Sequence, residues 1–183
     1  MSISFVRGAA GLLLLALSVV SSAAPAVDGT RSKVTATFRQ MKVPVEGAFT
    51  RVAGSIVFDA TNPAAASARI DIDTASFDLG MDDYNAEVRK KEWFDSATHP
   101  RASFVSSGFR PLGGDRYEAR GTLSIKGRSQ TVTVPVTVRP IGTALAFDGT
   151  LPVSRKAFGI GDASWDEMVE DPVHVQFHIV QPR

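Results

Sequence analysis

The sequence predicts an all-β domain whose antiparallel strands form a sandwich or an up-and-down barrel. Segments that alternate apolar and polar residues occupy most of the chain from residue 32 onward, and this period is typical of half-buried strands. Eight such segments can be distinguished, and short turns join most of them, as expected for antiparallel neighbours. A barrel of about eight strands either fills with side chains or holds one small ligand.

Each expected strand has one apolar face. Arg116–Ile125 is the clearest case, with apolar or aromatic residues and a glycine at every odd position from 117 to 125. Met41–Gly47 is expected to be a loop because it contains proline and glycine, and Ser154–Pro172 is expected to be a longer loop. The expected strands are Ser32–Gln40, Ala48–Asp59, Ala68–Asp73, Ala102–Phe109, Arg116–Ile125, Ser129–Arg139, Thr143–Val153 and Val173–Val180.

One stretch breaks the alternation and predicts a short helix near Tyr84–Lys91. Asp82 and Asp83 precede it, where carboxylates favour a helix N-terminus, and basic residues occupy its C-terminal end. Trp93 and Phe94 follow directly. Either these two aromatic residues cover the mouth of a barrel that contains an apolar cavity, or they fill the end of an ordinary core.

Small residues occupy several positions that are expected to face the interior. They are Ala68, Ala102, Ala119, Gly121 and Gly149. A core of leucine and phenylalanine would leave less room, so these residues favour a cavity, although small residues also permit tight packing. A transmembrane barrel is not expected, because the polar faces carry charged residues and the chain has only two Tyr and two Trp to form aromatic girdles.

The first residues have the pattern of a secretory signal peptide. Arg7 precedes the apolar run Ala9–Val20, and small residues follow before Pro25. We therefore expect residues 1–23 to be removed and residues 24–183 to form one exported barrel domain; an uncleaved anchor is the alternative. Lys and Arg total 20 against 19 Asp and Glu, so no nucleic-acid partner is expected. Cysteine is absent, which excludes disulfides, thiolate metal sites and a cysteine nucleophile.

Short motifs follow one another in a specific order along the chain. They are Ile70–Ser76, Arg89, Glu92–Asp95, His99–Pro100, Ser103–Phe104, Gly121–Gly127, Val132–Val136 and Arg155–Ile160. This series resembles the YceI family of bacterial periplasmic proteins, from about Val34 to Ile179. The resemblance implies an eight-stranded, lipocalin-like antiparallel barrel in the periplasm. It also implies an isoprenoid lipid as ligand, such as a polyprenyl quinone or a polyprenyl phosphate.

An isoprenoid tail needs little more than an apolar tube. Burial of one CH₂ group contributes roughly 0.8 kcal/mol, so each five-carbon unit contributes about 3–4 kcal/mol before the entropic costs of binding are subtracted. Plain core packing is the alternative role for every candidate residue, because a core and a pocket share the same alternation. The residues expected to contact the tail are Phe38, Ile70, Ile72, Phe94, Phe104, Leu123, Val134, Phe158 and Phe177.

Arg89 and Arg155 are the candidates for binding the ligand head group, because a guanidinium can donate to a phosphate or to a quinone carbonyl. The alternative for each is a structural ion pair with Asp95 or with the acidic loop. That loop, residues 161–172, is either solvated, paired with Arg89–Lys91 or docked to a basic partner. Its acidic residues are Asp162, Asp166, Glu167, Glu170 and Asp171.

No pattern in the sequence points to an enzyme or to a metal site. His174 and His178 share a strand face but stand about 13 Å apart at 3.3 Å per residue, and neither a phosphate-binding loop nor a nucleophile elbow is present. We expect a binding protein without catalytic activity, metal or cofactor other than the isoprenoid ligand.

The resemblance suggests two protein partners. The sequence is similar to members of this family that are associated with a membrane b-type cytochrome, which suggests such a cytochrome as partner. The resemblance also suggests a homodimer. The alternative function is a non-enzymatic interaction module that supports such a cytochrome or a stress response without carrying lipid.

Overall fold

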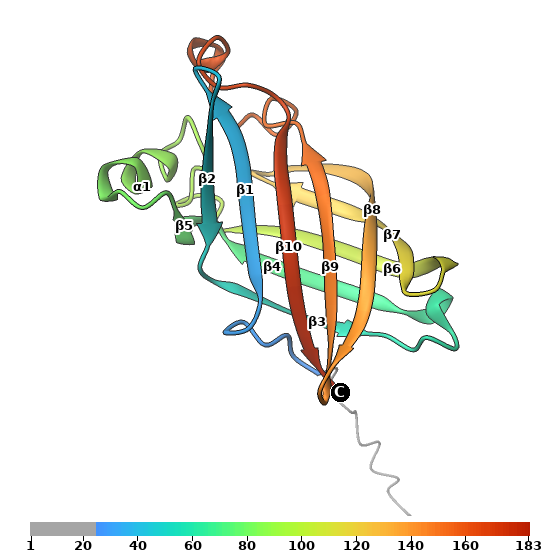
Figure 1. Cartoon of the computed structure of the whole chain (residues 1–183). Coiled ribbons are helices and arrows are strands. Elements are labelled where there is room, and N and C mark those ends of the chain that lie inside the picture. The colour runs from blue at the N-terminus through green and yellow to red at the C-terminus, as the bar shows by residue number, and fades with distance from the viewer. Residues whose placement is uncertain (1–24) are drawn as a thin grey trace, which may run out of the picture.

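The computed structural model describes residues 25–183, which form one strongly curled antiparallel sheet (Figure 1). The sheet has ten strands in the order β3-β4-β6-β7-β8-β9-β10-β1-β2-β5. Strands β1, β10, β9 and β8 cross over β3, β4, β6 and β7, so the sheet encloses an interior (Figure 1). The predicted signal peptide lies outside the described residues. No helix within residues 25–183 is long and apolar enough to cross a bilayer.

The all-β prediction and the single short helix are confirmed, but the strand count is ten rather than eight. The helix, α1, spans Asp82–Val88, and the short 3₁₀ helices are η1 (Pro63–Ala65), η2 (Thr74–Ser76) and η3 (Ala163–Trp165). The strands are β1 (Lys33–Gln40), β2 (Val43–Phe49), β3 (Val52–Val57), β4 (Ser67–Asp73), β5 (Phe77–Asp78), β6 (Arg101–Gly113), β7 (Arg116–Ile125), β8 (Arg128–Ile141), β9 (Ala144–Val153) and β10 (Val173–Pro182).

The predicted loop Met41–Gly47 is wrong, because most of it belongs to β2. Met41 and Lys42 form the turn between β1 and β2, with φ of 50° and 68°, and Gln40 pairs with Val43 directly across it. Pro44 is tolerated because it lies at a position that does not donate to β1, and β5 pairs with β2 only farther along. The turn was missed because positive φ at both central residues is usually signalled by Asn or Gly.

The predicted strand Ala48–Asp59 is two strands, and this division accounts for part of the difference in count. The chain turns at Thr50 and Arg51, whose backbone N–H groups bond the carbonyl and hydroxyl oxygens of Ser76. Strand β5 adds a further short strand that pairs with the end of β2. Such short pieces carry too few residues for alternation to reveal them.

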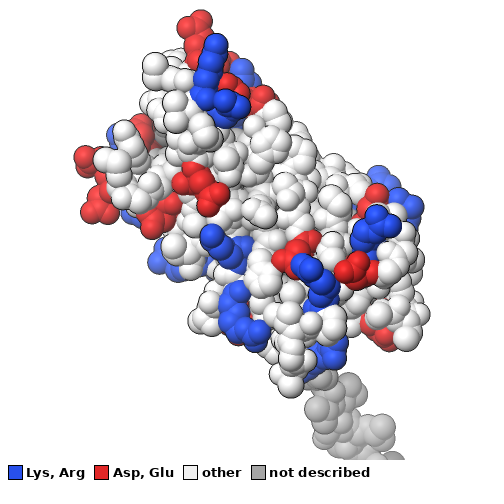
Figure 2. Space-filling model, viewed as in Figure 1, with Lys and Arg blue, Asp and Glu red and all other residues white. Residues whose placement is uncertain are grey.

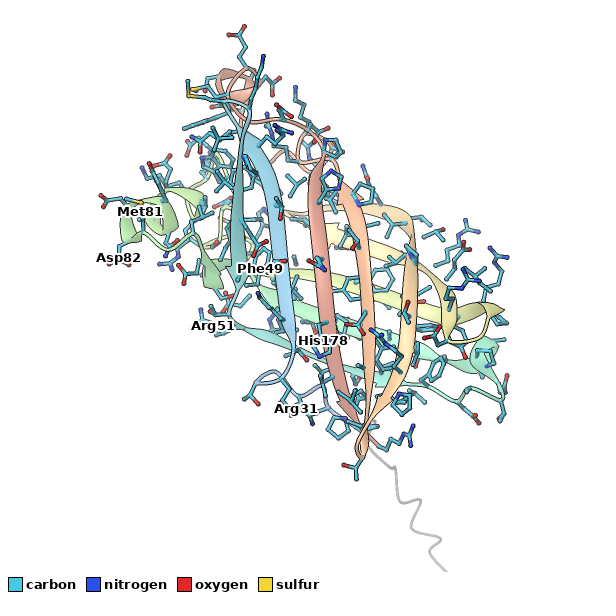
Figure 3. All side chains as sticks on the ribbon, in the orientation of Figure 1. Arg31, Phe49, Arg51, Met81, Asp82 and His178 are labelled. Carbon is cyan, nitrogen blue, oxygen red and sulfur yellow. The ribbon has the colours of Figure 1, made fainter. Side chains whose placement is uncertain are left out.

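Helix α1 begins slightly before its predicted start and ends at Val88, before the predicted end at Lys91. The basic residues Arg89–Lys91 therefore follow the helix and do not form its last turn. The helix lies beside β2 and β5 (Figure 1). Asp82 and Asp83 occupy its first turn rather than capping it. Figure 3 shows Met81 and Asp82 at the outer end of the helix, away from the sheet. Val88, at the other end, is buried against a cluster that includes Phe77.

The N-terminal segment links edge strand β3 to β10. Val27 N–H donates to the Gly54 carbonyl at 2.9 Å, and Asp28 N–H donates to the Val180 carbonyl at 2.8 Å. The buried side chain of Gln181 completes the link, because its Oε1 accepts from Ile56 N–H at 3.0 Å. These bonds satisfy backbone groups that an open sheet edge would leave unpaired.

Four aromatic residues close one end of the interior, which we call the aromatic end. Phe58 contacts Phe109, Tyr117 and Phe147 edge to face, with ring centroids 5.6, 5.2 and 5.6 Å apart. Phe109 also lies 6.3 Å from Phe147. These rings belong to one large hydrophobic cluster that continues along the barrel.

Candidate ligand-binding site

An apolar cavity of about 140 Å³ lies inside the barrel. Within the described part of the chain, Ser103 is the one polar residue of its lining, and no charged residue lines it. Such a cavity stays dry and accepts apolar groups. Its lining residues are Val34, Ile56, Ala68, Ile70, Ile72, Ala102, Ser103, Phe104, Phe109, Ala119, Leu123, Val134, Val136, Phe147, Leu151, Val175, Phe177 and Ile179.

Two phenylalanine rings of the lining lie over glycines of neighbouring strands. A Cβ atom at Gly121 would lie 2.7 Å from the Phe104 ring, and one at Gly149 would overlap the Phe177 ring. Phe177 and Gly149 are direct partners across β10 and β9. Because the glycines have no side chains, each ring occupies space against the wall that a side chain would otherwise fill.

The structure divides the predicted tail-contact residues into two groups. The cavity lining contains Ile70, Ile72, Phe104, Leu123, Val134 and Phe177. Phe38, Phe94 and Phe158 lie outside it, in two smaller clusters that share Trp93, Phe94 and Val175. Phe38 was expected on the same face of β1 as Val34, and Val34 lines the cavity whereas Phe38 does not.

Two chain segments lie over the end of the barrel opposite the aromatic residues, and we call this the covered end. One is residues 89–99, after α1, and the other is the loop of residues 154–172. Phe94 contacts Phe49 and Phe77 edge to face, at 5.8 and 5.6 Å. Trp93 contacts Trp165 of the loop with ring centroids 5.0 Å apart. The aromatic pair predicted at a barrel mouth therefore lies where the two segments meet.

Arg155 holds the loop of residues 154–172 from within. Its side chain is only 2% exposed. The guanidinium donates to the carbonyls of Val169 (2.6 Å) and Ile160 (3.1 Å), and it pairs with Asp166 at 3.1 Å. Arg155 thus forms the ion pair with the acidic loop that was the alternative to a head-group role. Its guanidinium N–H groups point to atoms of the loop and not to the cavity lining.

Lys126 joins the two covering segments. Its ammonium donates to the Gly159 carbonyl of the loop at 2.6 Å and to the Glu92 carbonyl of the other segment at 3.2 Å. Gly161 N–H donates to the same Glu92 carbonyl at 2.9 Å. Burial lowers the pKa of Lys126, although nearby acids, Asp95 first, oppose that shift. A cation from the β7–β8 turn thus connects segments that are far apart in sequence.

Arg89 is exposed where α1 ends and does not line the cavity. The acidic loop pairs with other cations: Asp166 contacts Lys156 at 3.0 Å, and Glu170 lies 3.9 Å from Arg39. The hydrogen bond from Lys156, together with that from Arg155, holds the pKa of Asp166 below its ordinary value.

A polar groove lies on the outer face of the sheet, separate from the cavity. Its lining includes Asp148 and His178, whose Oδ1 and Nδ1 are 2.6 Å apart, and Figure 3 shows His178 on β10 among the front strands. Burial raises the pKa of Asp148, but hydrogen bonds from His178 and Arg139 outweigh it and lower the pKa overall. Within residues 25–183, no group of three or more His, Cys, Asp or Glu residues could hold a metal ion.

Sequence reasoning missed part of the site. Phe147, Leu151 and Val175 line the cavity, and their places on apolar strand faces were a usable signal. The bonds of Lys126 and the contact of Trp93 with Trp165 had no such signal, because both join segments distant in sequence.

Known proteins are similar to this chain in sequence or in fold. A UPF0312 protein of Azotobacter vinelandii is 32% identical over 124 residues, which cover 62% of this chain and 62% of the relative. A UPF0312 protein of Vibrio cholerae is 26% identical over 140 residues, covering 72% of this chain and 73% of the relative. The chain thus spans less than two thirds of the Azotobacter relative and somewhat more of the Vibrio relative.

Two solved structures match most of the described chain. BcnA of Burkholderia cenocepacia is 48% identical, with a TM-score of 0.81 over 84% of this chain and 98% of that chain. A polyisoprenoid binding domain from Saccharophagus degradans, implicated in plant cell wall breakdown, has a TM-score of 0.73 at 19% identity, covering 87% of this chain and 98% of that chain. The YceI-like domain model matches residues 26–181, and the chain therefore belongs to the YceI-like domain family.

Proposed function

We propose that the exported protein binds an isoprenoid lipid in the barrel cavity and stores or carries it in the periplasm. The observation that carries this proposal is the cavity itself, an apolar space bounded by strand faces along the barrel. The ligand must be apolar over the part that enters, because the described lining exposes no polar atom to the cavity.

The proposed ligand is a chain rather than a compact ring system. Ala68, Ala102 and Ala119 project only a methyl group each from β4, β6 and β7 into the cavity. The rings of Phe104 and Phe177 lie over glycines. A narrow apolar space between sheet faces suits methyl-branched chain segments. The polyisoprenoid binding described for the Saccharophagus domain supports the same ligand class, which we extend to this chain as part of the proposal.

A long chain does not fit the barrel without movement. Ligand pockets generally measure about 300–1,000 Å³, and this cavity measures about 140 Å³. We propose that the covered end moves aside when the ligand enters, so that Phe94 and Phe158 come to contact the chain. Arg89 is then the candidate for the head group, because it is exposed at the end of α1 beside a covering segment.

The first test is native mass spectrometry of protein purified from the periplasm, followed by organic extraction and mass analysis of lipids. We expect a stoichiometric isoprenoid lipid. Protein that carries no isoprenoid and takes up neither ubiquinone nor polyprenyl phosphate from detergent micelles would contradict the proposal.

A matched pair of variants on β6 tests the location. Ala102→Phe fills the cavity, whereas Val105→Phe adds the same ring to an exposed position on the same strand. We expect Ala102→Phe to reduce uptake by at least about tenfold, which corresponds to the loss of burial of only about two CH₂ groups, and Val105→Phe to leave it unchanged. Thermal unfolding of both variants checks that each remains folded.

A further inference from the structure

An apolar tip projects beyond the covered end of the barrel. It consists of Met41 and Val43, at the β1–β2 turn, and Met168, in the loop of residues 154–172. Their exposed fractions are 72%, 61% and 37%. Figure 1 shows the turn and this loop together at the upper end of the molecule. Exposed apolar side chains gathered at one place commonly mark an interaction site.

The tip is held by backbone bonds between its two segments. Met41 N–H donates to the Met168 carbonyl at 2.7 Å, and Glu170 N–H donates to the Arg39 carbonyl at 2.9 Å. Val169, between them, is buried, and its carbonyl accepts from Arg155. The side chains of Met41 and Met168 therefore project from two segments that are hydrogen-bonded to each other.

The turn itself does not account for a methionine at residue 41. Its φ of 50° is unfavourable for a residue with a long side chain, and glycine or asparagine would form the same turn at lower cost. The Met41 side chain is largely exposed, so contacts within the described structure do not account for it either.

The charges around the tip are balanced. Glu170 lies near Arg39, and Asp166 is paired with both Arg155 and Lys156. Figure 2 shows acidic and basic side chains side by side at this end of the molecule. A partner that binds through a strong field of one sign does not fit such a surface, whereas a zwitterionic surface with an apolar interior does.

We propose that the apolar tip inserts into the interfacial layer of a phospholipid bilayer, with the covered end of the barrel facing the membrane. The strand β1 runs from the tip through Phe38 and Ala36 to Val34, which lines the cavity. Docking at the tip thus places the covering segments against the lipid phase. The choice of a membrane as partner rests on the proposed function, because an isoprenoid lipid partitions into membranes.

The test is flotation of the exported protein with phosphatidylcholine vesicles. The variant M41D/M168D is compared with L112D, which alters a residue of 40% exposure at the β6–β7 hairpin, at the other end of the molecule (Figure 1). Aspartate tolerates the left-handed backbone at residue 41. We expect the unaltered protein and L112D to float with vesicles and M41D/M168D to lose at least about tenfold of that association.

Two outcomes would overturn the proposal: no flotation of the unaltered protein, or equal flotation of M41D/M168D. We also expect about 0.5 M NaCl to change flotation by less than about twofold, since the attraction is apolar, and a steep loss would instead indicate docking by charge. Uptake of ubiquinone and of polyprenyl phosphate from detergent micelles by the same variants separates the two proposals. Uptake without flotation leaves the proposed function standing, and absence of uptake contradicts that function whatever the vesicles do.

Discussion

The two ends of the barrel are closed by different kinds of interaction. At the aromatic end, side chains of Phe58, Phe109, Tyr117 and Phe147 pack edge to face inside one hydrophobic cluster. At the covered end, segments outside the strands lie over the interior and are held by buried polar bonds.

This difference indicates which end opens. Rings that interlock in a core lose their contacts together, so opening the aromatic end amounts to unfolding the barrel. The covering segments also pack Phe94 and Trp93, but in two smaller clusters. They are joined to each other by a few hydrogen bonds, whose net contribution is about 1 kcal/mol each because water replaces them on opening. Trp93 is part of this cover, and its buried Nε1 has no hydrogen-bond partner among the described residues. We therefore expect local opening at the covered end.

The largest effect is expected at the aromatic end. Phe147→Ala removes a ring that is 2% exposed and contacts both Phe58 and Phe109. We expect the free energy of unfolding to fall by about 3–5 kcal/mol, as for other buried phenylalanines. Urea denaturation measures this loss. A loss below about 1 kcal/mol would mean that this end is not a packed core.

A smaller and more local effect is expected from Arg155→Met. The change leaves the carbonyls of Val169 and Ile160 without their donor, which costs about 2–3 kcal/mol in the closed state. Hydrogen exchange should accelerate across residues 154–172 and remain slow in β6, β7 and β8. Uniform acceleration throughout the sheet would contradict the distinction between the two ends.

Arg110→Met is the control for that change. Arg110 pairs with Glu118 on an exposed face of β6 and β7, and its side chain is 68% exposed. Exposed pairs contribute about 0–1 kcal/mol. A loss of stability as large as that of Arg155→Met would show that burial is not what distinguishes the two arginines.

The smallest effect is expected from acid. The pKa of Asp166 is lowered in the folded protein, so its carboxylate stabilises the closed loop above its ordinary pKa of 3.8. That stabilisation disappears as the pH falls through the lower folded-state value. The chain has two tryptophans, Trp93 and Trp165, and both lie at the covered end, so their fluorescence follows the loop.

Asp166→Asn should remove part of the acid-induced change in tryptophan fluorescence. At neutral pH, the tryptophan fluorescence of the Asp166→Asn protein should resemble that of the unaltered protein in acid. Glu167→Gln changes a neighbouring acid and serves as the control. An identical acid transition in the Asp166→Asn protein would exclude Asp166 as the responsible group.

The sequence by itself determined which faces of the strands are apolar, and with them most of the interior. Ile70, Ile72, Leu123 and Val134 were expected to face inward from alternation alone, and all of them line the cavity. Alternation is a local property, because successive side chains of a strand point to opposite faces wherever the strand lies. For the same reason the sequence also indicated the small residues of the walls.

Only the tertiary structure decided how the ends close. Lys126 bonds the Glu92 carbonyl across a separation of 34 residues, and Arg155 reaches Val169 across 14. Which backbone carbonyls come within hydrogen-bond distance of a cation depends on the curvature of the sheet and on the path of the loops. Neither can be predicted from the residue types alone. The β1–β2 turn at Met41 was hidden for a related reason: its backbone is set by the pairing of the flanking strands rather than by its own residues.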